Sequence, residues 1–534
     1  MQNTKKILSI TNLKKYFPVA KSSIFQKQQL YVRANEDITL DIFEGETLGI
    51  VGESGCGKST LGRVLLQLYP QTAGNTMYYG KTLDEMTPKD VEDTIKRYDK
   101  YLAKFNKASA RASELSKKVE EIGEDKADFY LIQDRNLAKC EEQTCLNNMV
   151  TILGGFFAKK DQQALDLMLK IYSENQKRNA VNEKYSDAKV EYDHLEHEDA
   201  QKNASKISAL KTQLDQFQSE IDKTSLVIDE LNKQLDGIRE KYAGDEEFSK
   251  YEAMRDNGID LARLKYTEMR FLRKDLQIIF QDPYSSLNPR MTVGQIIEEG
   301  LVTHKFFKHG SQKMRDYIVE TMEKCGLQEY MLHRYPHQFS GGQRQRIAIA
   351  RALAVKPKFV VCDECVSALD VSIQSQIINL LQELKEKEHL TYMFISHDLS
   401  VVRYISDRIC VMYLGNVVEL ADAATVFDDP RHPYTVALLS SIPTTDIDSL
   451  SKERIILEGN IPSPIKPPSG CKFRTRCYMA CEKCERVPPE LREIEPGHFV
   501  ACHFPEKKMD ADGNYLFELP KMERKSMRKE ESEN

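Results

Sequence analysis

A phosphate-binding loop constrains this sequence more than any other feature. Residues 52–59, Gly-Glu-Ser-Gly-Cys-Gly-Lys-Ser, match the pattern GxxxxGK[ST] and stand between an apolar run, residues 48–51, and a helical pattern, residues 59–68. Glycines let successive backbone N–H groups point at phosphate oxygens, and the helix N-terminus adds partial positive charge. Lys58 can reach the β and γ phosphates, and the Ser59 hydroxyl can bind Mg²⁺. The sequence therefore predicts a nucleoside triphosphate site at Gly52, Glu53, Ser54, Gly55, Cys56, Gly57, Lys58, Ser59 and Thr60.

Length and composition indicate several domains and no membrane span. The chain has 534 residues, which is enough for roughly three domains. No apolar run approaches the roughly 20 residues that cross a bilayer, and the first residues lack the apolar core of a signal peptide. We therefore expect a protein that is soluble by itself and reaches a membrane only through a partner. The net charge of −6 gives no indication of nucleic-acid binding, and 12 cysteines without a secretion signal favour a reducing cytoplasm.

Two α/β parts are separated by a segment of different composition. Residues 1–92 contain the phosphate loop and short β-type runs, and residues 266–440 return to the same alternation. The apolar strands expected in the second part lie at residues 275–280, 359–362 and 392–395. Fully apolar strands of this length are typical of a buried parallel sheet. The predicted fold class is therefore α/β, interrupted by residues 93–265.

The intervening segment, residues 93–265, is rich in Lys and Glu, contains no proline and repeats apolar residues at spacings of three and four. One such seam covers residues 98–122 and another covers residues 207–242. Seams of this kind predict coiled-coil helices. We expect them to be the two arms of one antiparallel hairpin, with an arm over residues 205–242 reaching roughly 57 Å. The more apolar residues 149–171 would form its tip, and the segment would pack on itself or on a partner without carrying chemistry.

The second α/β part supplies a pair of carboxylates directly after an apolar strand, residues 359–362. Asp363 can hold Mg²⁺ there, directly or through water. Glu364 can accept a proton from the attacking water or orient it. The alternative interpretation is a pair of ordinary surface carboxylates, which the preceding apolar run disfavours.

A second anion site is predicted at Ser340, Gly341 and Gly342, which precede a helical run over residues 343–353. Small residues at a helix N-terminus place backbone N–H groups where an anion can bind. Alone they could be a simple helix cap. Followed by Gln343-Arg-Gln-Arg, they form a more specific pattern.

Taken together, the motifs resemble the ATPase subunit of an ABC transporter. They are the phosphate loop, FSGGQRQR at 339–346, CDE at 362–364, SALD at 367–370 and ISHD at 395–398, in this order over about residues 1–92 and 269–440. The resemblance implies a P-loop ABC-type ATPase domain that binds ATP and Mg²⁺. It also implies a head-to-tail dimer, in which Ser340, Gly341, Gly342 and Gln343 of one subunit face the γ-phosphate held by the other.

The same resemblance assigns roles to three further residues. Gln281 would connect Mg²⁺ and the water to the membrane partner, and His397 would contact the γ-phosphate. Tyr16, with Phe17 as the alternative, would stack on adenine. Each residue also has an ordinary structural interpretation, namely a loop amide, a polar residue at a strand end and a core aromatic ring.

Residues 277–292, 368–374 and 431–435 look like those of oligopeptide/dipeptide importer ATPases of the F type. That resemblance implies a second, related ATPase subunit, two transmembrane permease subunits, an extracytoplasmic solute-binding protein and a peripheral position on the cytoplasmic face of the membrane. The chain departs from the family at Cys365, where relatives usually have proline after Asp-Glu, and in the long insertion. Both carboxylates are intact, so we expect activity to survive.

A Pro- and Cys-rich module is expected at residues 441–505, followed by a charged, solvated tail at 506–534. Four of its cysteines, Cys471, Cys477, Cys484 and Cys502, are separated by five, six and seventeen residues, with Cys481 as a spare. Four thiolates of this kind suit a [4Fe–4S] cluster or a zinc site, and reduced cysteines without metal are a third interpretation. Similarity to the terminal module of peptide-importer ATPases favours iron in a structural role.

Three other functions compete with oligopeptide import. Importers of nickel or other solutes use closely similar ATPases. Coiled-coil ATPases of chromosome maintenance or DNA repair also interrupt such a head, but their coil is far longer and enters after the residue that corresponds to Gln281. Translation-associated ABC proteins carry two ATP heads, and only one is present here. We therefore expect no nucleic-acid partner and no salt-dependent binding to duplex DNA.

Overall fold

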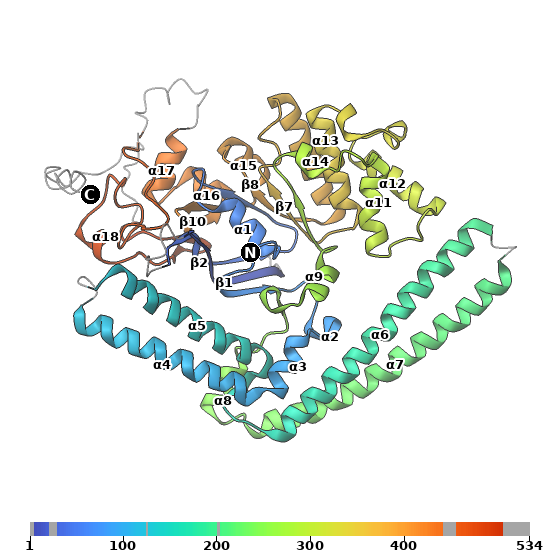
Figure 1. The fold of residues 1–534 in the computed structure, drawn as a ribbon, viewed down its shortest axis with the longest axis horizontal. Coiled ribbons are helices and arrows are strands. Elements are labelled where there is room, and N and C mark those ends of the chain that lie inside the picture. The colour runs from blue at the N-terminus through green and yellow to red at the C-terminus, as the bar shows by residue number, and fades with distance from the viewer. Residues whose placement is uncertain are drawn as a thin grey trace.

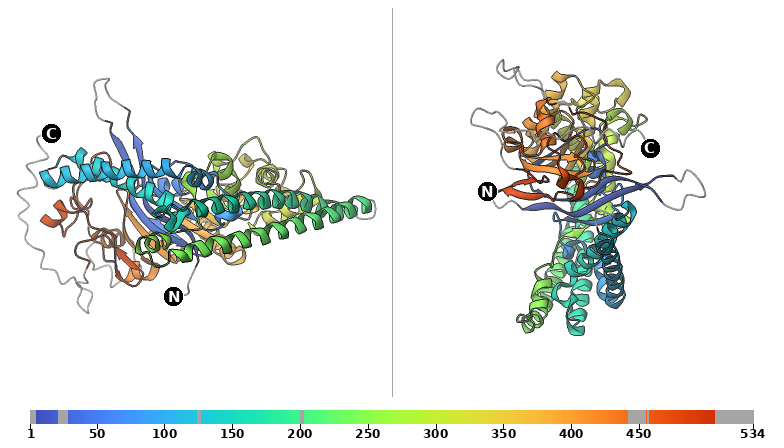
Figure 2. Two further views of the ribbon diagram at one scale, coloured as in Figure 1. Left: turned by 90° about the horizontal axis from the view of Figure 1, so that it is seen from below. Right: turned by 90° about the vertical axis from the view of Figure 1, so that its left-hand side faces the viewer.

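The computed structural model describes residues 5–20, 29–123, 127–199, 203–441, 455 and 457–505. The charged tail expected at residues 506–534 lies outside this range, as do parts of the 441–505 module. Figure 1 shows an α/β head from which two long helical hairpins project, and Figure 2 shows both hairpins leaving the same side of the head.

The larger of two sheets has eight strands in the order β11-β12-β10-β9-β3-β8-β7-β6. Its strands are β3 (Thr47–Val51), β6 (Leu276–Ile279), β7 (Phe359–Asp363), β8 (Thr391–Ile395), β9 (Arg408–Tyr413), β10 (Asn416–Asp422), β11 (Arg492–Glu495) and β12 (His498–Val500). From β9 to β6 every neighbouring pair is parallel, whereas β10, β12 and β11 add on antiparallel. The carboxyl ends of β3, β6, β7 and β8 therefore lie along one edge.

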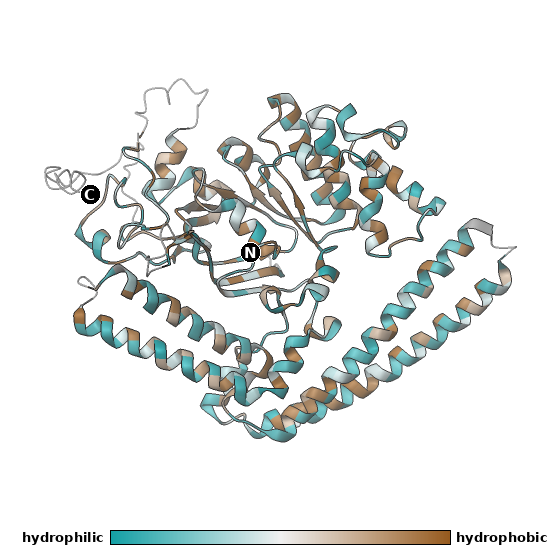
Figure 3. Ribbon diagram, in the orientation of Figure 1, coloured by the Kyte–Doolittle hydropathy of each residue, from teal (hydrophilic) through white to brown (hydrophobic). Residues whose placement is uncertain are grey.

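The parallel strands are apolar throughout because both faces of the sheet are covered. On β7, Phe359 and Val361 face a core shared with the smaller sheet, whereas Val360 and Cys362 face a core shared with the helices of the second α/β part. Figure 3 shows these strands mostly brown and the long hairpin helices mostly teal. The large sheet is thus the buried centre of the head.

The smaller sheet is antiparallel, with the order β2-β1-β4-β5. Its strands are β1 (Lys6–Pro18), β2 (Tyr31–Phe43), β4 (Ala73–Tyr78) and β5 (Ile259–Asp260). It shares its core with α1 (Lys58–Leu65) and with β3.

Helices cover the rest of the head. A helical lobe follows β6 and contains α10 (Pro283–Ser286), α11 (Val293–Thr303), α12 (Gln312–Lys324) and α13 (Gly341–Ala354). The other head helices are α9 (Tyr266–Leu272), α14 (Val371–Glu388), α15 (Leu399–Ile405), α16 (Ala423–Asp428), α17 (Pro433–Ser440) and α18 (Glu482–Arg486). Short 3₁₀ turns occur at Leu261–Arg263, Glu329–Met331 and Pro336–Gln338.

The inserted helices begin earlier than residue 93. The chain leaves the smaller sheet after Tyr78 and returns to it at Ile259, and these two residues are paired across β4 and β5. In between lie α2 (Leu83–Met86), α3 (Lys89–Lys96), α4 (Tyr98–Ile122), α5 (Phe129–Leu153), a 3₁₀ turn (Gly154–Phe157), α6 (Gln162–Asp199), α7 (Ala204–Lys241) and α8 (Glu246–Glu252). The insertion thus leaves and re-enters the head at two neighbouring strands.

The prediction of one hairpin with arms at 98–122 and 205–242 is wrong. The structure has two antiparallel hairpins, one made of α4 and α5 and the other of α6 and α7 (Figure 1). Each arm therefore pairs with its neighbour in sequence rather than with the distant seam. The physical reason is that a short connection brings consecutive antiparallel helices together at a lower entropic cost than a long one.

Residues 149–171 form the base of the hairpins and not a tip. Phe156 and Phe157 in the 3₁₀ turn are buried, and Phe156 packs on Phe248 of α8 with ring centroids 5.3 Å apart. Residues from α3, α4, α5, α6 and α7 complete this cluster. The segment is apolar because several helices meet there.

Both hairpins contact the head. On β4, Asn75 receives a hydrogen bond from Asn147 of α5 (Nδ2 to Oδ1, 3.0 Å). On the helical lobe, Lys305 forms an ion pair with Asp187 of α6 (2.8 Å). Among the described residues, no helix has both the length and the hydropathy needed to cross a bilayer.

Candidate functional site

The phosphate loop, Gly52–Gly57, connects β3 to α1 at the carboxyl edge of the large sheet. Gly57 is the N-cap of α1 and has φ of 101°, a left-handed conformation that favours glycine. A Cβ atom on Gly57 would lie 2.0 Å from the Ala34 carbonyl oxygen of β2. Glycine is therefore required here both by backbone conformation and by the close approach of β2.

The ammonium group of Lys58 is turned into this loop. Its Nζ donates to the carbonyl oxygens of Gly52 (2.7 Å) and Glu53 (3.1 Å), and the residue is 5% exposed. Ser59 and Thr60 follow it on the first turn of α1. The loop thus combines a helix N-terminus with a buried cation, which is the arrangement that binds a polyphosphate.

Three strand ends bring Gln281, Glu364 and His397 together. Gln281 follows β6, Glu364 follows β7 and His397 follows β8. Gln281 Nε2 donates to Glu364 Oε2 at 2.8 Å, and His397 Nδ1 lies 3.7 Å from the same oxygen. Because these strands run parallel to β3 in the same sheet, this group lies at the same edge of the sheet as the phosphate loop. This arrangement is compatible with the predicted role of Glu364 as the general base, which stays a prediction.

Asp363 fits the predicted role of Mg²⁺ ligand. Its side chain is 3% exposed and Oδ2 receives a bond from Arg63 Nη2 at 3.3 Å. Its other oxygen, Oδ1, is buried and has no hydrogen-bond partner among the residues the structure describes. Burying a carboxylate oxygen without a hydrogen-bond partner costs folding free energy. Carboxylate oxygens are also preferred ligands of Mg²⁺, so a bound ion would remove this cost. Asp363 and the Ser59 hydroxyl would hold the ion, which neutralises charge on the phosphates.

Ser340 and Gln343 form the N-terminal capping box of α13. Ser340 Oγ accepts from the Gln343 N–H (3.3 Å), and Gln343 Oε1 accepts from the Ser340 N–H (3.1 Å). Ser340 and Gly341 are exposed to solvent. Within the described part of the chain, no hydrogen bond joins this segment to the phosphate loop. The N-terminus of α13 is therefore accessible from solvent, so it could contact a ligand that is bound to another subunit.

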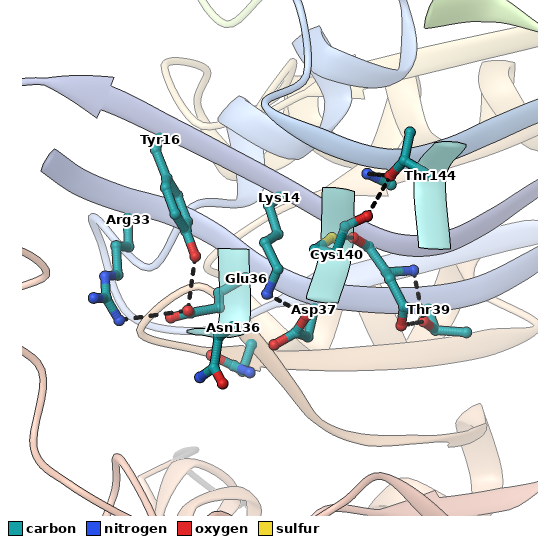
Figure 4. A network of polar contacts seen from close by, with 12 residues as sticks. Lys14, Tyr16, Arg33, Glu36, Asp37, Thr39, Asn136, Cys140 and Thr144 are labelled. Atoms are coloured by element: carbon teal, nitrogen blue, oxygen red, sulfur yellow. Dashed lines mark hydrogen bonds and ion pairs between the residues drawn. The ribbon is translucent and has the colours of Figure 1, made fainter. Parts of the chain in front are cut away.

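Tyr16 does not offer its ring to a nucleotide in this structure. The residue is 6% exposed, and its hydroxyl donates to Glu36 Oε1 at 2.8 Å. Figure 4 shows Tyr16 and Arg33 converging on Glu36, with α5 residues such as Cys140 nearby. Burial raises the pKa of Tyr16. Adenine stacking by Tyr16 would require this side chain to rotate outward, so the assignment stays a prediction.

Sequence reasoning missed the C-terminal residues that touch the phosphate loop. Arg476 forms two hydrogen bonds with the Glu53 carboxylate, and the Glu53 N–H donates to the Tyr434 hydroxyl at 2.8 Å. The Arg476 side chain and the Glu53 carboxylate are separated by 423 residues. Arg476 lies between Cys471 and Cys477, which were predicted to bind a metal. Nothing in the surrounding sequence indicated that its guanidinium group would contact the phosphate loop.

The four terminal cysteines line one small cavity. Burial raises the pKa of Cys471 to about 11 and also raises those of Cys477, Cys484 and Cys502. Among the described residues, no group of three or more His, Cys, Asp or Glu side chains is arranged to hold a metal ion. The predicted iron–sulfur site is therefore not supported by this arrangement of thiols.

Comparisons with known proteins identify two family matches in the chain. Residues 35–235 and 243–367 match the family model described as ABC transporter, and residues 418–484 match one described as oligopeptide/dipeptide transporter, C-terminal region. Similar proteins include the putative oligopeptide transport ATP-binding protein YkfD of Bacillus subtilis, 54% identical over 46% of this chain and 75% of the relative. AppF of the same organism is 52% identical with the same coverage, and OppF of Salmonella typhimurium is 53% identical over 46% of this chain and 73% of the relative.

The chain belongs to the ABC transporter family. The family membership defines an ATP-binding subunit that hydrolyses ATP. The two matches also explain the domain order, because the ATPase region precedes the region that matches the oligopeptide/dipeptide transporter model.

Proposed function

We propose that this ATPase energises the import of oligopeptides or dipeptides, as the F-type subunit of an ABC importer. The observation that carries the proposal is the presence in one chain of an ABC-type ATPase region and a C-terminal region that matches the oligopeptide/dipeptide transporter model. The relatives described above are named for oligopeptide transport. Nickel or another small solute is the alternative cargo, because importers of such solutes use closely similar ATPases.

The proposed assembly contains a second, related ATPase, two permease subunits and an extracytoplasmic solute-binding protein. The exposed Ser340–Gly341 end of α13 would complete the partner ATPase's site, and the partner would do the same for Lys58 here. ATP binding then closes the dimer, and hydrolysis reopens it. The chain would be peripheral, on the cytoplasmic face of the membrane.

Reconstitution into liposomes with the co-purified membrane subunits tests this proposal. We expect uptake of short peptides that requires ATP and ceases in Lys58→Ala, while the isolated subunit hydrolyses ATP only weakly because the complementary α13 end is missing. Glu383→Gln, on the exposed face of α14, is the control. Uptake of nickel but not peptides would assign the alternative cargo, and full activity of the monomer would contradict the assembly.

An iron–sulfur cluster at Cys471, Cys477, Cys484 and Cys502 is a separate proposal. Although the thiols are not arranged as metal ligands in the described structure, they line one cavity, and the backbone N–H groups of Met479 and Phe504 donate to the sulfurs of Cys477 (3.3 Å) and Cys502 (3.4 Å). Such bonds stabilise cluster thiolates. Binding would draw the thiols closer and release their protons.

Metal analysis of anaerobically purified protein decides this point. We expect about four iron atoms and four acid-labile sulfides per chain, with visible absorption that Cys477→Ser abolishes. Cys325→Ser, which changes a buried cysteine of the helical lobe, should keep the absorption. One zinc per chain, or no metal, would contradict the cluster.

A further inference from the structure

The loop between Cys471 and Cys477, here called the cysteine loop, packs directly on the ATP-binding head. Phe473 is 2% exposed, and its ring centroid lies 5.1 Å from that of Tyr413 and 5.4 Å from that of Tyr434. Lys472 Nζ donates to Glu36 Oε2 (2.9 Å), to the Leu414 carbonyl oxygen (3.1 Å) and to Asn416. The loop is thus fixed against β2 and the β9–β10 turn.

Positive charges on the cysteine loop are paired with carboxylates of the head, one of which, Glu36, is buried. Burial alone would raise the pKa of Glu36, but Lys472, Arg33 and Lys14 together hold it below its ordinary value. Glu36 is therefore a buried anion whose charge depends partly on a cation from the cysteine loop. A pairing of this kind fixes the position of both partners, because separating them leaves a buried charge unpaired.

Arg476 extends the same pattern to the phosphate loop. Its Nη1 donates to Glu53 Oε2 at 2.6 Å and its Nη2 to Glu53 Oε1 at 2.9 Å, a bidentate geometry. The Arg476 side chain is 7% exposed and the Glu53 side chain 23% exposed. The hydrogen bond to Glu53 raises the pKa of Arg476, which therefore stays charged. Glu53 is held at its carboxylate by Arg476 and at its N–H by Tyr434.

Glu53 is well placed to pass this constraint to the nucleotide. Its carbonyl oxygen accepts from Lys58 Nζ at 3.1 Å, so its backbone position helps to set the position of the phosphate-binding ammonium. Its carboxylate also belongs to a loop that binds a polyanion. Without a cation beside it, that carboxylate would repel the triphosphate, and the repulsion grows with phosphate charge in a partly buried site.

We propose that Arg476 is a positioning residue for ATP, which acts from the cysteine loop by fixing and neutralising Glu53 of the phosphate loop. The inference deepens the proposed function, because it concerns the same ATP site. It depends on nucleotide binding alone and is independent of the cargo and of any metal at the cysteines. The C-terminal region is thereby a structural part of the nucleotide site.

Equilibrium binding of ATP and ADP to the full-length chain tests the proposal. We expect Arg476→Gln to raise the Kd for ATP roughly tenfold and that for ADP by less, since the repulsion grows with charge. Arg476→Lys should recover part of the loss, because it restores the charge without the bidentate geometry. Arg474→Gln is the matched control, since Arg474 bonds to Ser469 within the C-terminal module (Nε to carbonyl oxygen, 3.0 Å).

A double variant separates positioning from general damage to the module. Combining Arg476→Gln with Glu53→Gln removes the unpaired carboxylate, so we expect it to regain most of the lost ATP affinity. Normal ATP binding by Arg476→Gln would overturn the proposal. So would equal losses in Arg474→Gln and Arg476→Gln, or a double variant as weak as Arg476→Gln alone. Transport of an unexpected solute would leave all these outcomes unchanged.

Discussion

Replacing Glu364 with glutamine should stop hydrolysis while leaving ATP bound. The amide can still accept the hydrogen bond from Gln281 Nε2, which is 2.8 Å from Glu364 Oε2, so the local geometry should survive. What is lost is the basic oxygen that takes a proton from the attacking water. General-base catalysis contributes roughly 10²–10⁴-fold, and we expect turnover to fall by at least roughly 10²-fold.

The backbone at Glu364 supports this role. The residue has φ of 49°, an uncommon conformation for a side chain other than glycine. Its N–H donates to the Ile395 carbonyl oxygen (3.0 Å), and its own carbonyl oxygen accepts from the Ser367 hydroxyl (2.9 Å). Neighbouring elements thus hold a strained backbone that directs the carboxylate toward Gln281 and His397, and such strain is typical of functional sites.

Single-turnover ATP cleavage in the assembled transporter measures the effect. ATP binding should change by less than about threefold, which separates loss of chemistry from loss of affinity. Glu383→Gln removes an exposed carboxylate on α14 that pairs with Lys387, and it should hydrolyse ATP at the normal rate. If Glu364→Gln kept near-normal turnover, the general base would have to be another group.

Part of the ATP site could be predicted because three of its residues follow short strands of one sheet. Gln281, Glu364 and His397 stand after β6, β7 and β8, and parallel neighbours necessarily present their carboxyl ends at one edge. The position of each residue after its strand is therefore enough to predict that the three side chains lie at the same edge of the sheet. Distances between side chains on different loops depend on how the loops pack, and the sequence does not give them. An example is the 3.7 Å between His397 Nδ1 and Glu364 Oε2.

The hairpins illustrate what periodicity leaves open. A spacing of three and four identifies the apolar face of a helix, but it does not say which other helix packs against that face. In the structure the pairing follows helix length, since α4 and α5 have 25 residues each and α6 and α7 have 38 each, and the two seams seen in the sequence did not give these lengths. Matched neighbours of this kind indicate two hairpins, with the apolar stretch between them, including Phe156, as a shared base.

Tyr16 and Arg476 show why contacts across the fold escape sequence reasoning. The resemblance placed Tyr16 at an adenine, but its burial depends on Glu36 and Arg33 from the neighbouring strand. The bond from Arg476 to Glu53 joins residues 423 positions apart, in a loop that Phe473 also packs against Tyr413 and Tyr434. Neither contact produces a repeating pattern in the sequence from which it could have been predicted.

Replacing Gly57 with alanine should destabilise the head and greatly weaken ATP binding. The new Cβ would lie 2.0 Å from the Ala34 carbonyl oxygen, and φ of 101° is unfavourable for alanine as well. Left-handed strain costs about 1–3 kcal/mol and overpacking adds a similar amount. We expect the free energy of unfolding to fall by about 3 kcal/mol or more, and the Kd for ATP to rise roughly 100-fold.

The effect on ATP follows from where the strain is relieved. Ala34 belongs to a paired strand, whereas the phosphate loop connects β3 to α1 and can move more easily. Moving it displaces the first N–H groups of α1 and the Lys58 ammonium, which bind the phosphates. Gly45→Ala is the matched control, because Gly45 has φ of 78° but no atom within 4 Å of a new Cβ. It should lose only about 1 kcal/mol and bind ATP normally. Urea unfolding and ATP titration of both variants test the argument, and equal losses of affinity would show that the contact with β2 does not shape the loop.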